Sequence, residues 1–212
     1  MDDLTKEYRH VPVMLGEVLE ALDPQAGETV CDCTLGGAGH SVELARRVAP
    51  DGLLLGIDQD DMALEAAQAR LAKEAPEAQV RLLKGNFGDM DELLVEAEVP
   101  GIDCFLFDLG VSSPQLDIAQ RGFSYHGDAP LDMRMNPDKH NITAAEVINT
   151  YNEADLVRVL RTYGDERHAR RIAHLICERR KRAPIETTLQ LADLVCDAIP
   201  ARCRVVSMGA RL

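Results

Sequence analysis

Strand-like and helix-like segments alternate along the first 110 residues of this sequence. Four short apolar runs have the length of buried strands and cover residues 29–33, 53–58, 80–83 and 102–108. Apolar positions recur at helical spacing before and between them, over residues 13–22, 41–48, 60–75 and 91–98. Strands that alternate with helices in this way are typical of a parallel sheet covered on both faces. The pattern therefore predicts an α/β fold.

The alternation stops after Asp108, and a helical region follows. Residues 109–142 are rich in glycine and proline, and a stretch of this length without regular elements is usually functional. Helices are expected after it, and their start signals lie at Thr143, at Asn152, at Asp165, and at Thr187 or Thr188. The sequence thus predicts a sheet-containing part followed by a helical part.

The clearest signal for a ligand is the glycine-rich turn of residues 32–40, Asp-Cys-Thr-Leu-Gly-Gly-Ala-Gly-His. It lies between a predicted strand and a predicted helix, where glycine lets the backbone approach a ligand and the helix start offers unpaired N–H groups. Asp58 follows Gly39 by 19 residues and ends the second predicted strand. A carboxylate there can accept hydrogen bonds from both hydroxyls of a ribose. Together these features predict a nucleoside-binding crevice at the carboxyl ends of the strands.

Departures from known phosphate-binding loops indicate which nucleoside cofactor is involved. A dinucleotide loop needs a third glycine where this chain has Val42, and the Gly-Lys-Ser/Thr of a Walker loop is absent. A dehydrogenase is therefore disfavoured. S-adenosylmethionine has no pyrophosphate, needs fewer N–H donors, and suits a turn that starts from an acid such as Asp32. The sequence favours this methyl donor.

Residues at the ends of the third and fourth predicted strands fit the same chemistry. The Phe87 ring would suit an adenine face, although a plain core phenylalanine is the alternative. Asp108 begins a loop that would face the transferable methyl group in this architecture. Methylation of an exocyclic amino nitrogen is helped by acceptors that orient its N–H bonds, and the Ser113 hydroxyl or the Ser113-Pro114 backbone can supply them. Ser113 is equally typical of a simple turn.

Composition bounds the class of protein and its surroundings. A chain of 212 residues with 46% apolar and 28% charged residues is typical of a globular protein. No apolar run approaches the roughly 20 residues that cross a bilayer, and the N-terminus lacks a signal-peptide pattern, so we expect a cytoplasmic protein. The six cysteines form no C-x-x-C pair, and we expect reduced core thiols and no metal site. The oligomeric state stays open.

Charge is distributed unevenly along the chain. The net charge is −13, from 23 Lys and Arg against 36 Asp and Glu, and on average this repels a polyanion. Residues 158–182 nevertheless carry nine basic and three acidic residues, a local charge of +6 that leaves −19 for the remainder. On a helix that begins at Asp165, one face would carry Arg167, Arg170 and Arg171. We expect that face either to contact RNA phosphates or to be solvated.

Longer motifs resemble one known family. They are His10-Val11-Pro12-Val13, Gly36-Gly37-Ala38-Gly39-His40-Ser41, Gly56-Ile57-Asp58, Gly85-Asn86-Phe87, Asp108 to Gln115, Arg121-Gly122-Phe123-Ser124, Pro130-Leu131-Asp132-Met133-Arg134-Met135 and Tyr163-Gly164-Asp165-Glu166-Arg167. On these motifs, which span about residues 8–200, the chain resembles the RsmH (MraW) family. Members of this family are bacterial S-adenosylmethionine-dependent methyltransferases that modify N4 of a decoding-centre cytosine in 16S ribosomal RNA.

The resemblance implies a Rossmann-like, class I methyltransferase fold with an inserted helical subdomain and the small ribosomal subunit as partner. Carried over position by position, it places S-adenosylmethionine against Ala38, Gly39, His40, Asp58, Phe87, Asp108 and Gln115. Ser113 is the candidate catalytic residue. We expect a cofactor-binding domain over residues 1–115, a substrate-recognition subdomain over 116–200, and a tail over 201–212.

The chain also departs from the family. Members are about a third longer and return to the sheet for its last strands, whereas this sequence stops at Leu212. Its last residues do not resemble the family's continuation, as a truncation or a reading-frame change near Ile199 would produce. We then expect an open sheet edge beyond the fourth strand and a partly uncovered apolar face. The alternative to an active methyltransferase is a truncated, non-catalytic chain that keeps part of the cofactor and RNA surface.

Overall fold

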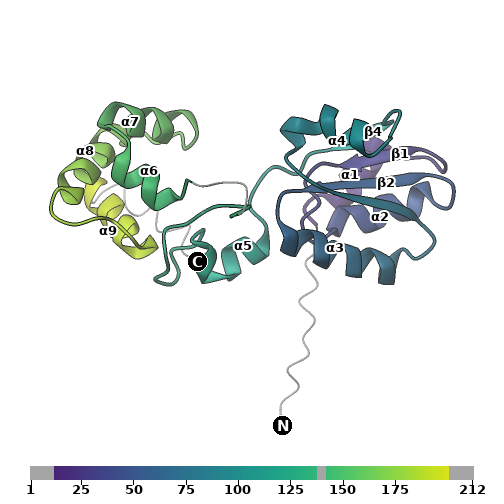
Figure 1. The fold of residues 1–212 in the computed structure, drawn as a ribbon, viewed down its shortest axis with the longest axis horizontal. Coiled ribbons are helices and arrows are strands. Elements are labelled where there is room, and N and C mark those ends of the chain that lie inside the picture. The colour runs from purple at the N-terminus through teal and green to yellow at the C-terminus, as the bar shows by residue number, and fades with distance from the viewer. Residues whose placement is uncertain (1–11, 138–141, 201–212) are drawn as a thin grey trace, which may run out of the picture. The chain divides into compact units, whose positions relative to one another are not determined.

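The computed structural model describes residues 12–137 and 142–200, which belong to two compact units, residues 1–110 and 111–212. Figure 1 shows a sheet with helices in the first unit and helices alone in the second. The division comes before the boundary expected after residue 115. Ser113 and Gln115 therefore belong to the helical unit.

The first unit is a parallel α/β sheet. Its elements in chain order are α1 (Leu15–Leu22), β1 (Thr29–Asp32), α2 (Gly39–Val48), β2 (Leu53–Asp58), α3 (Asp61–Glu74), β3 (Gln79–Lys84), the 3-10 turn η1 (Phe87–Asp89), α4 (Met90–Glu96) and β4 (Cys104–Leu106). The strands lie in the order β3-β2-β1-β4, and every neighbouring pair is parallel. The predicted α/β, Rossmann-like fold is confirmed.

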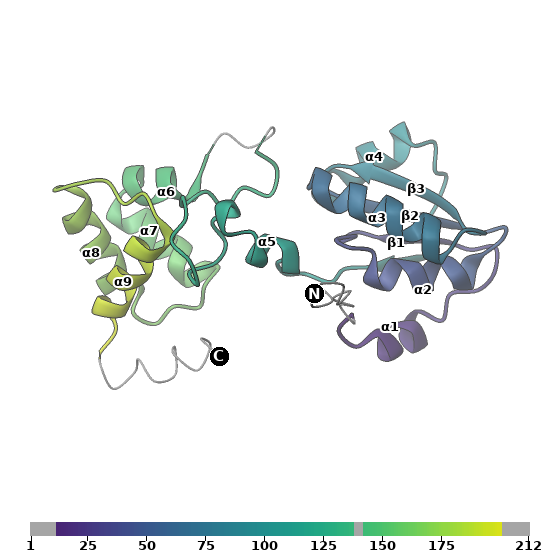
Figure 2. The same ribbon diagram turned by 90° about the horizontal axis from the view of Figure 1, so that it is seen from below.

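Alternating side chains of the strands supply two separate cores. Val30, Leu54 and Leu106 face one side, where they pack with buried residues of α1, α2 and α3. Cys31, Leu55 and Ile57 face the other side, where α4 contributes Leu93 and neighbouring apolar residues. Figures 1 and 2 show α4 on the opposite side of the sheet from α2. Both faces of the central strands are therefore covered, which explains their uninterrupted apolar runs.

The order of the strands places a topological switch point between β1 and β4. The chain passes from β1 to β2 and β3 on one side and then returns to add β4 on the other. Ligands of open α/β sheets bind at the carboxyl ends of the strands beside such a switch point. In the described residues β4 pairs only with β1, so the expected open edge beyond the fourth strand is observed there.

The second unit is helical. Its elements are α5 (Ser113–Asp117), the 3-10 turn η2 (Ala119–Arg121), α6 (Ala144–Thr150), α7 (Glu153–Thr162), α8 (Ala169–Arg180) and α9 (Thr188–Ala198). Leu156, Ile172 and Ile176 lie at the centre of its core. The predicted caps are confirmed, because the side chains of Thr143, Asn152 and Thr187 accept hydrogen bonds from backbone N–H groups in the first turns of α6, α7 and α9.

The expected start of the basic helix at Asp165 is wrong. Asp165 has a φ of 47° and lies in the connection between α7 and α8. The Glu166 N–H donates to the Leu160 carbonyl at 3.1 Å, and the Glu166 carboxylate accepts the His168 N–H at 2.6 Å. These residues close α7 and lead into α8, so Arg167 precedes the helix that carries Arg170 and Arg171.

One arginine of the basic segment is part of the packing. Arg180 lies on the side of α8 that carries the buried Ile172 and Ile176, and its guanidinium donates to the Ile148 and Tyr151 carbonyls at 2.6 Å each. These carbonyls lie at the end of α6, where helical carbonyls lack partners of their own. Arg180 therefore links α8 to α6 and stabilises the packing of these two helices.

Candidate functional site

In the glycine-rich loop between β1 and α2, each small residue is needed for a different structural reason. Gly36 has a φ of +47°, and Ala38 has a φ of 57° although it carries a Cβ. A Cβ on Gly37 would have no atom within 4 Å, whereas one on Gly39 would lie 2.6 Å from Cγ of Pro12. The space at Gly37 fits the close approach of a ligand. At Gly39 a side chain is excluded because Pro12 packs against the Cα.

Asp58 joins the end of β2 to this loop. Its Oδ2 accepts the Gly36 N–H at 2.9 Å, and its Oδ1 accepts the Asp60 N–H at 2.9 Å. A carboxylate has about four acceptor positions, so each oxygen keeps one position for a ribose hydroxyl. The half-buried Asp58 can thus fix the loop and bind a ligand with the same two oxygens. Its expected place beside the loop is confirmed, and its contact with a ribose stays a prediction.

The Asp32 carboxylate, at the end of β1, forms hydrogen bonds within the protein. Its side chain is 2% exposed and accepts hydrogen bonds from the Ser41 hydroxyl at 2.5 Å and from the Thr34 N–H at 3.1 Å. Burial raises the pKa of the Asp32 carboxyl, and the bonds from Ser41 and Thr34 oppose that rise. Asp32 therefore stabilises the conformation of the glycine-rich loop.

His40 and Asp108 meet at the switch point. His40 is buried, and its Nε2 lies 3.0 Å from the Val13 carbonyl. Because a carbonyl only accepts, Nε2 carries a proton, and Nδ1 faces Oδ2 of Asp108 at 3.8 Å. The Asp108 side chain is 57% exposed, which leaves it accessible to a ligand. The structure brings these two predicted site residues together, while their contact with a cofactor stays a prediction.

Three phenylalanines form a cluster after β3 and along β4. The Phe87 and Phe107 rings meet edge to face with centroids 5.6 Å apart, and Phe105 stacks on Phe107 at 6.4 Å. All three are exposed, Phe87 at 36%, so Phe87 is not the plain core residue that the sequence left as an alternative. An exposed ring at this end of the sheet is suited to contact an adenine face. The exposed Phe105 and Phe107 agree with the expected uncovered apolar face.

The remaining two predicted site residues lie in the second unit. Ser113 begins α5. Gln115 is buried, and its Oε1 accepts the Ser112 N–H at 2.9 Å, which closes the start of that short helix. Gln115 thus has a local structural use, and its assignment to the cofactor stays a prediction.

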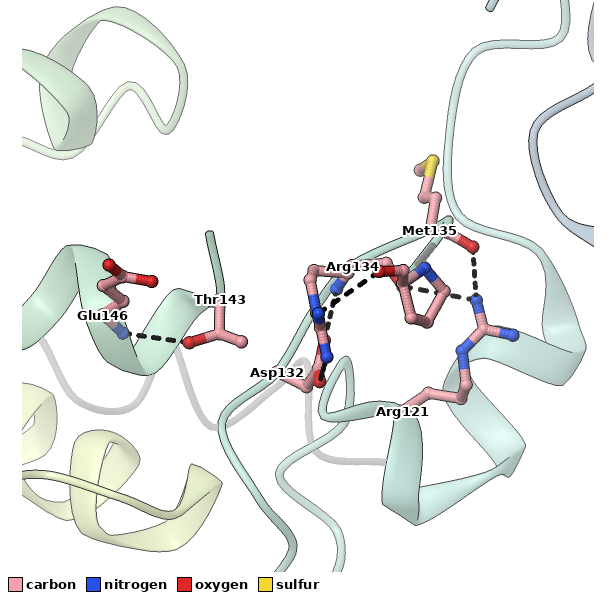
Figure 3. Close-up of polar contacts among 7 residues, drawn as sticks. Arg121, Asp132, Arg134, Met135, Thr143 and Glu146 are labelled. Carbon is pink, nitrogen blue, oxygen red and sulfur yellow. Dashed lines mark hydrogen bonds and ion pairs between the residues drawn. The ribbon is translucent and has the colours of Figure 1, made fainter. Parts of the chain in front are cut away.

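The motif of residues 130–135 forms a tight polar loop in the second unit (Figure 3). Both carboxylate oxygens of Asp132 accept from the Arg134 guanidinium, at 2.8 and 2.7 Å, and one also accepts the Arg134 N–H at 2.9 Å. The Arg121 guanidinium donates to the Met135 carbonyl at 3.0 Å. Gly122 has a φ of +74°, and a Cβ there would lie 2.5 Å from the Pro130 carbonyl. The loop is therefore fixed by two arginines and one obligatory glycine.

This loop gives the second unit a defined pH dependence. The Arg134 guanidinium holds the pKa of the Asp132 carboxyl below its ordinary value of 3.8. A lowered pKa in the folded state adds stability above the unfolded value and loses it as the pH falls through the folded value. We expect Asp132→Asn to lower the free energy of unfolding by about 1–2 kcal/mol at pH 6 and by progressively less below about pH 4.

Thermal unfolding of the wild type and the variant between pH 6 and pH 2.5 measures this difference. Asp128→Asn is the matched control, because Asp128 is an exposed carboxylate of the same segment. A gap between wild type and Asp132→Asn that stays constant over the whole range would contradict the assignment.

Sequence reasoning missed Thr34 and Ser41, which hold Asp32. The available signal was a hydroxyl residue two positions after an acid at a strand end, a pattern typical of a side-chain turn. Among the described residues no group of three potential metal ligands lies together. The five cysteines in the described part are free thiols; the Sγ atoms of Cys31 and Cys33 lie 3.6 Å apart. No helix in the ranges 12–137 and 142–200 combines the length and apolar character needed to cross a membrane.

Comparison with known proteins gives the family. A protein of Desulfosudis oleivorans named Ribosomal RNA small subunit methyltransferase H is 47% identical over 93% of this chain and 62% of its own length. A protein of Geobacter sulfurreducens with the same name is 50% identical over 91% of this chain and 61% of its own length. The chain thus spans about three fifths of the length of these relatives. The MraW methylase family matches residues 7–209, which extends into the expected tail, and the chain belongs to that family.

Proposed function

We propose that this chain binds S-adenosylmethionine at the carboxyl ends of β1, β2 and β4 and methylates N4 of a cytosine in 16S ribosomal RNA. The observation that carries the proposal is the bond between Asp58 and the Gly36 N–H, because it brings a carboxylate that suits ribose hydroxyls beside a glycine-rich loop at the switch point. The names of the curated relatives support an RNA of the small ribosomal subunit as substrate.

The residues present fit this cofactor. Asp58 keeps acceptor positions for two hydroxyls, Gly37 leaves space beside the loop, and the exposed Phe87 ring offers a face to adenine. When bound, S-adenosylmethionine supplies an electrophilic methyl group on a sulfonium. Ala38, Gly39, His40, Asp108 and Gln115 complete the proposed binding set.

The second half of the proposed site acts on the base. The N4 lone pair of cytosine is delocalised into the ring, so acceptors that hold its N–H bonds help by orientation and by electrostatics. Ser113, at the start of α5, and the carbonyl of Pro114 are the proposed acceptors. Neither needs to be a strong base. The chain therefore contributes positioning to the transfer.

Cofactor class is tested by thermal unfolding with added ligand. We expect S-adenosylhomocysteine to raise the melting temperature and NAD to leave it unchanged, since a ligand that binds only the folded state stabilises it. A rise with NAD and none with S-adenosylhomocysteine would overturn the proposed cofactor.

Ser113→Ala tests the chemical role. We expect a methyl-transfer rate lower by roughly tenfold and nearly unchanged affinity for S-adenosylhomocysteine, because the hydroxyl acts on the acceptor base. Single-turnover transfer and calorimetry measure the two quantities separately. If the variant loses cofactor affinity instead, Ser113 supports the pocket and the proposed role is wrong.

A second candidate is a chain that binds ligand without transferring methyl groups. The favouring observations are the exposed Phe105 and Phe107 at β4, which pairs on one side only in the described residues. Methyl transfer by this chain and by a version extended with the relatives' continuation distinguishes the candidates. Activity of the extended version alone would establish the second.

A further inference from the structure

Thr34 joins the ends of β1 and β4 through its side chain. Its Oγ1 accepts the Asp108 N–H at 2.8 Å and donates to Oδ1 of the buried Asp32 at 3.4 Å. This hydroxyl thus bonds to a residue 74 positions later in the sequence. None of the motifs discussed above gives Thr34 this task.

The bond to Asp108 continues the sheet beyond its last regular rung. β1 and β4 pair in parallel from Val30 and Cys104 onward, and the Cys33 N–H still donates to the Leu106 carbonyl at 2.9 Å. In a regular parallel ladder the next rung would run from the Asp108 N–H to a carbonyl of the chain leaving β1. That chain has turned into the glycine-rich loop, and the Thr34 hydroxyl accepts the bond in place of a carbonyl.

The hydroxyl is itself held in place. The Asp32 carboxylate accepts both the Thr34 N–H, at 3.1 Å, and the Thr34 hydroxyl, while the Ser41 hydroxyl of α2 donates to its other oxygen at 2.5 Å. Because Asp32 is only 2% exposed, water does not compete for these bonds. The Thr34 Oγ1 is therefore held by two bonds, to Asp32 and to the Asp108 N–H, and Asp32 is itself fixed by Ser41.

His40 faces the same strand end. Its ring lies between the Val13 carbonyl and the Asp108 carboxylate, so both the backbone and the side chain of Asp108 face partners from the loop and α2. From this network we infer that Thr34 is a positioning residue: its hydroxyl, anchored on Asp32, fixes Asp108 and with it the start of the loop that leads to Ser113. The inference rests on the proposed function for its effect on the cofactor, and on geometry alone for its effect on Asp108.

Hydrogen exchange of single backbone amides, followed by NMR, tests the geometric part directly. In the wild type the Asp108 amide is expected to exchange slowly, since its N–H is bonded within the protein. In Thr34→Val it is expected to exchange at least about tenfold faster, while the Cys33 amide, bonded to Leu106, keeps its protection. Thr34→Ser retains the hydroxyl and is expected to restore protection at Asp108. Unchanged protection of Asp108 in Thr34→Val would overturn the inference.

Calorimetry with S-adenosylhomocysteine tests the consequence for binding. We expect Thr34→Val to weaken binding about fivefold, the effect of one lost hydrogen bond, and Thr34→Ser to restore it. If Thr34 affects binding by positioning the Asp108 carboxylate, Thr34→Val causes no further loss in an Asp108→Ala background, which keeps the backbone N–H but lacks that carboxylate. A full additional loss in that background would show that Thr34 acts elsewhere and would overturn the positioning role.

Thr188→Val is the matched control for a general loss of stability. The Thr188 hydroxyl makes the same pair of bonds in the second unit: it accepts the Ala129 N–H at 3.3 Å and donates to the Gly127 carbonyl at 3.0 Å. We expect it to lower the melting temperature as Thr34→Val does and to leave affinity for S-adenosylhomocysteine unchanged. Should the wild type itself not bind S-adenosylhomocysteine, the proposed function fails, and hydrogen exchange at Asp108 still decides the role of Thr34.

Discussion

Asp58→Ala is expected to weaken the binding of S-adenosylmethionine by at least about tenfold. The substitution removes the proposed acceptor of both ribose hydroxyls, and a hydrogen bond to a charged acceptor contributes about 1.5–3 kcal/mol. It also removes the acceptor of the Gly36 N–H, so the glycine-rich loop loses its tie to β2. Titration calorimetry of the wild type and the variant measures the change.

Asp58→Asn serves as the graded variant. An amide keeps one acceptor oxygen, so we expect a smaller loss of affinity than for alanine. Asp51→Ala is the matched control, because Asp51 is an exposed carboxylate of the same unit in the turn before β2. Unchanged affinity in Asp58→Ala would contradict the assignment of this strand end to the cofactor.

Neutralisation of Arg167, Arg170 and Arg171 is expected to weaken RNA binding strongly. These three side chains are exposed, and within the described residues no hydrogen bond or ion pair engages them. Residues 1–110 carry eight Lys and Arg against 23 Asp and Glu, a net charge of −15, whereas residues 111–212 carry 15 against 13, a net charge of +2. The balance of charge therefore favours the second unit as the part of this chain that attracts RNA phosphates.

Salt dependence distinguishes phosphate contact from a solvated face. We expect the glutamine triple variant to lower the slope of log affinity against log salt by up to about one unit per lost contact, with cofactor affinity unchanged. A second triple variant, at Arg158, Arg179 and Lys181, has the same change in charge. These cations are already engaged by Asp155, by the Ala183 carbonyl and by Glu178, so a smaller change is expected. Equal slopes for wild type and first variant would contradict RNA contact by this face.

The sheet could be predicted because its signals are local. The second apolar run, residues 53–58, coincides with β2, and Asp60 caps α3 as expected from its position before an alanine-rich segment. The carboxyl ends of parallel strands meet at one edge, so the nearness of the glycine-rich loop and Asp58 also followed from the order of the elements.

The start of α8 could not be predicted, because two local signals conflict. Asp165 follows Gly164 and resembles an N-terminal cap, but Asp165 and Glu166 close α7 instead, and α8 begins at Ala169. The cluster of basic residues in the segment 158–182 also made Arg180 a candidate for phosphate contact. Its position on the buried side of α8 and its bonds to the end of α6 are visible only in the folded chain.

Long-range contacts explain the rest of what the sequence did not reveal. Gly39 has a second requirement that the sequence did not show, because a Cβ there would lie 2.6 Å from Cγ of Pro12; its contact with a cofactor stays a prediction. Thr34 was not considered for the site, because its bond to the Asp108 N–H joins segments that no local pattern connects. These features were missed because each residue's partner is distant in the sequence.

The most direct test of the account is the position of the methyl group in RNA. Small-subunit ribosomal RNA that lacks the modification is incubated with this chain or its extended version and S-adenosylmethionine, and its nucleosides are then analysed by mass spectrometry. The account predicts N4-methylcytidine at a single site of 16S ribosomal RNA, and its loss with Asp58→Ala. Methylation at another atom, or none with either version of the chain, would contradict it.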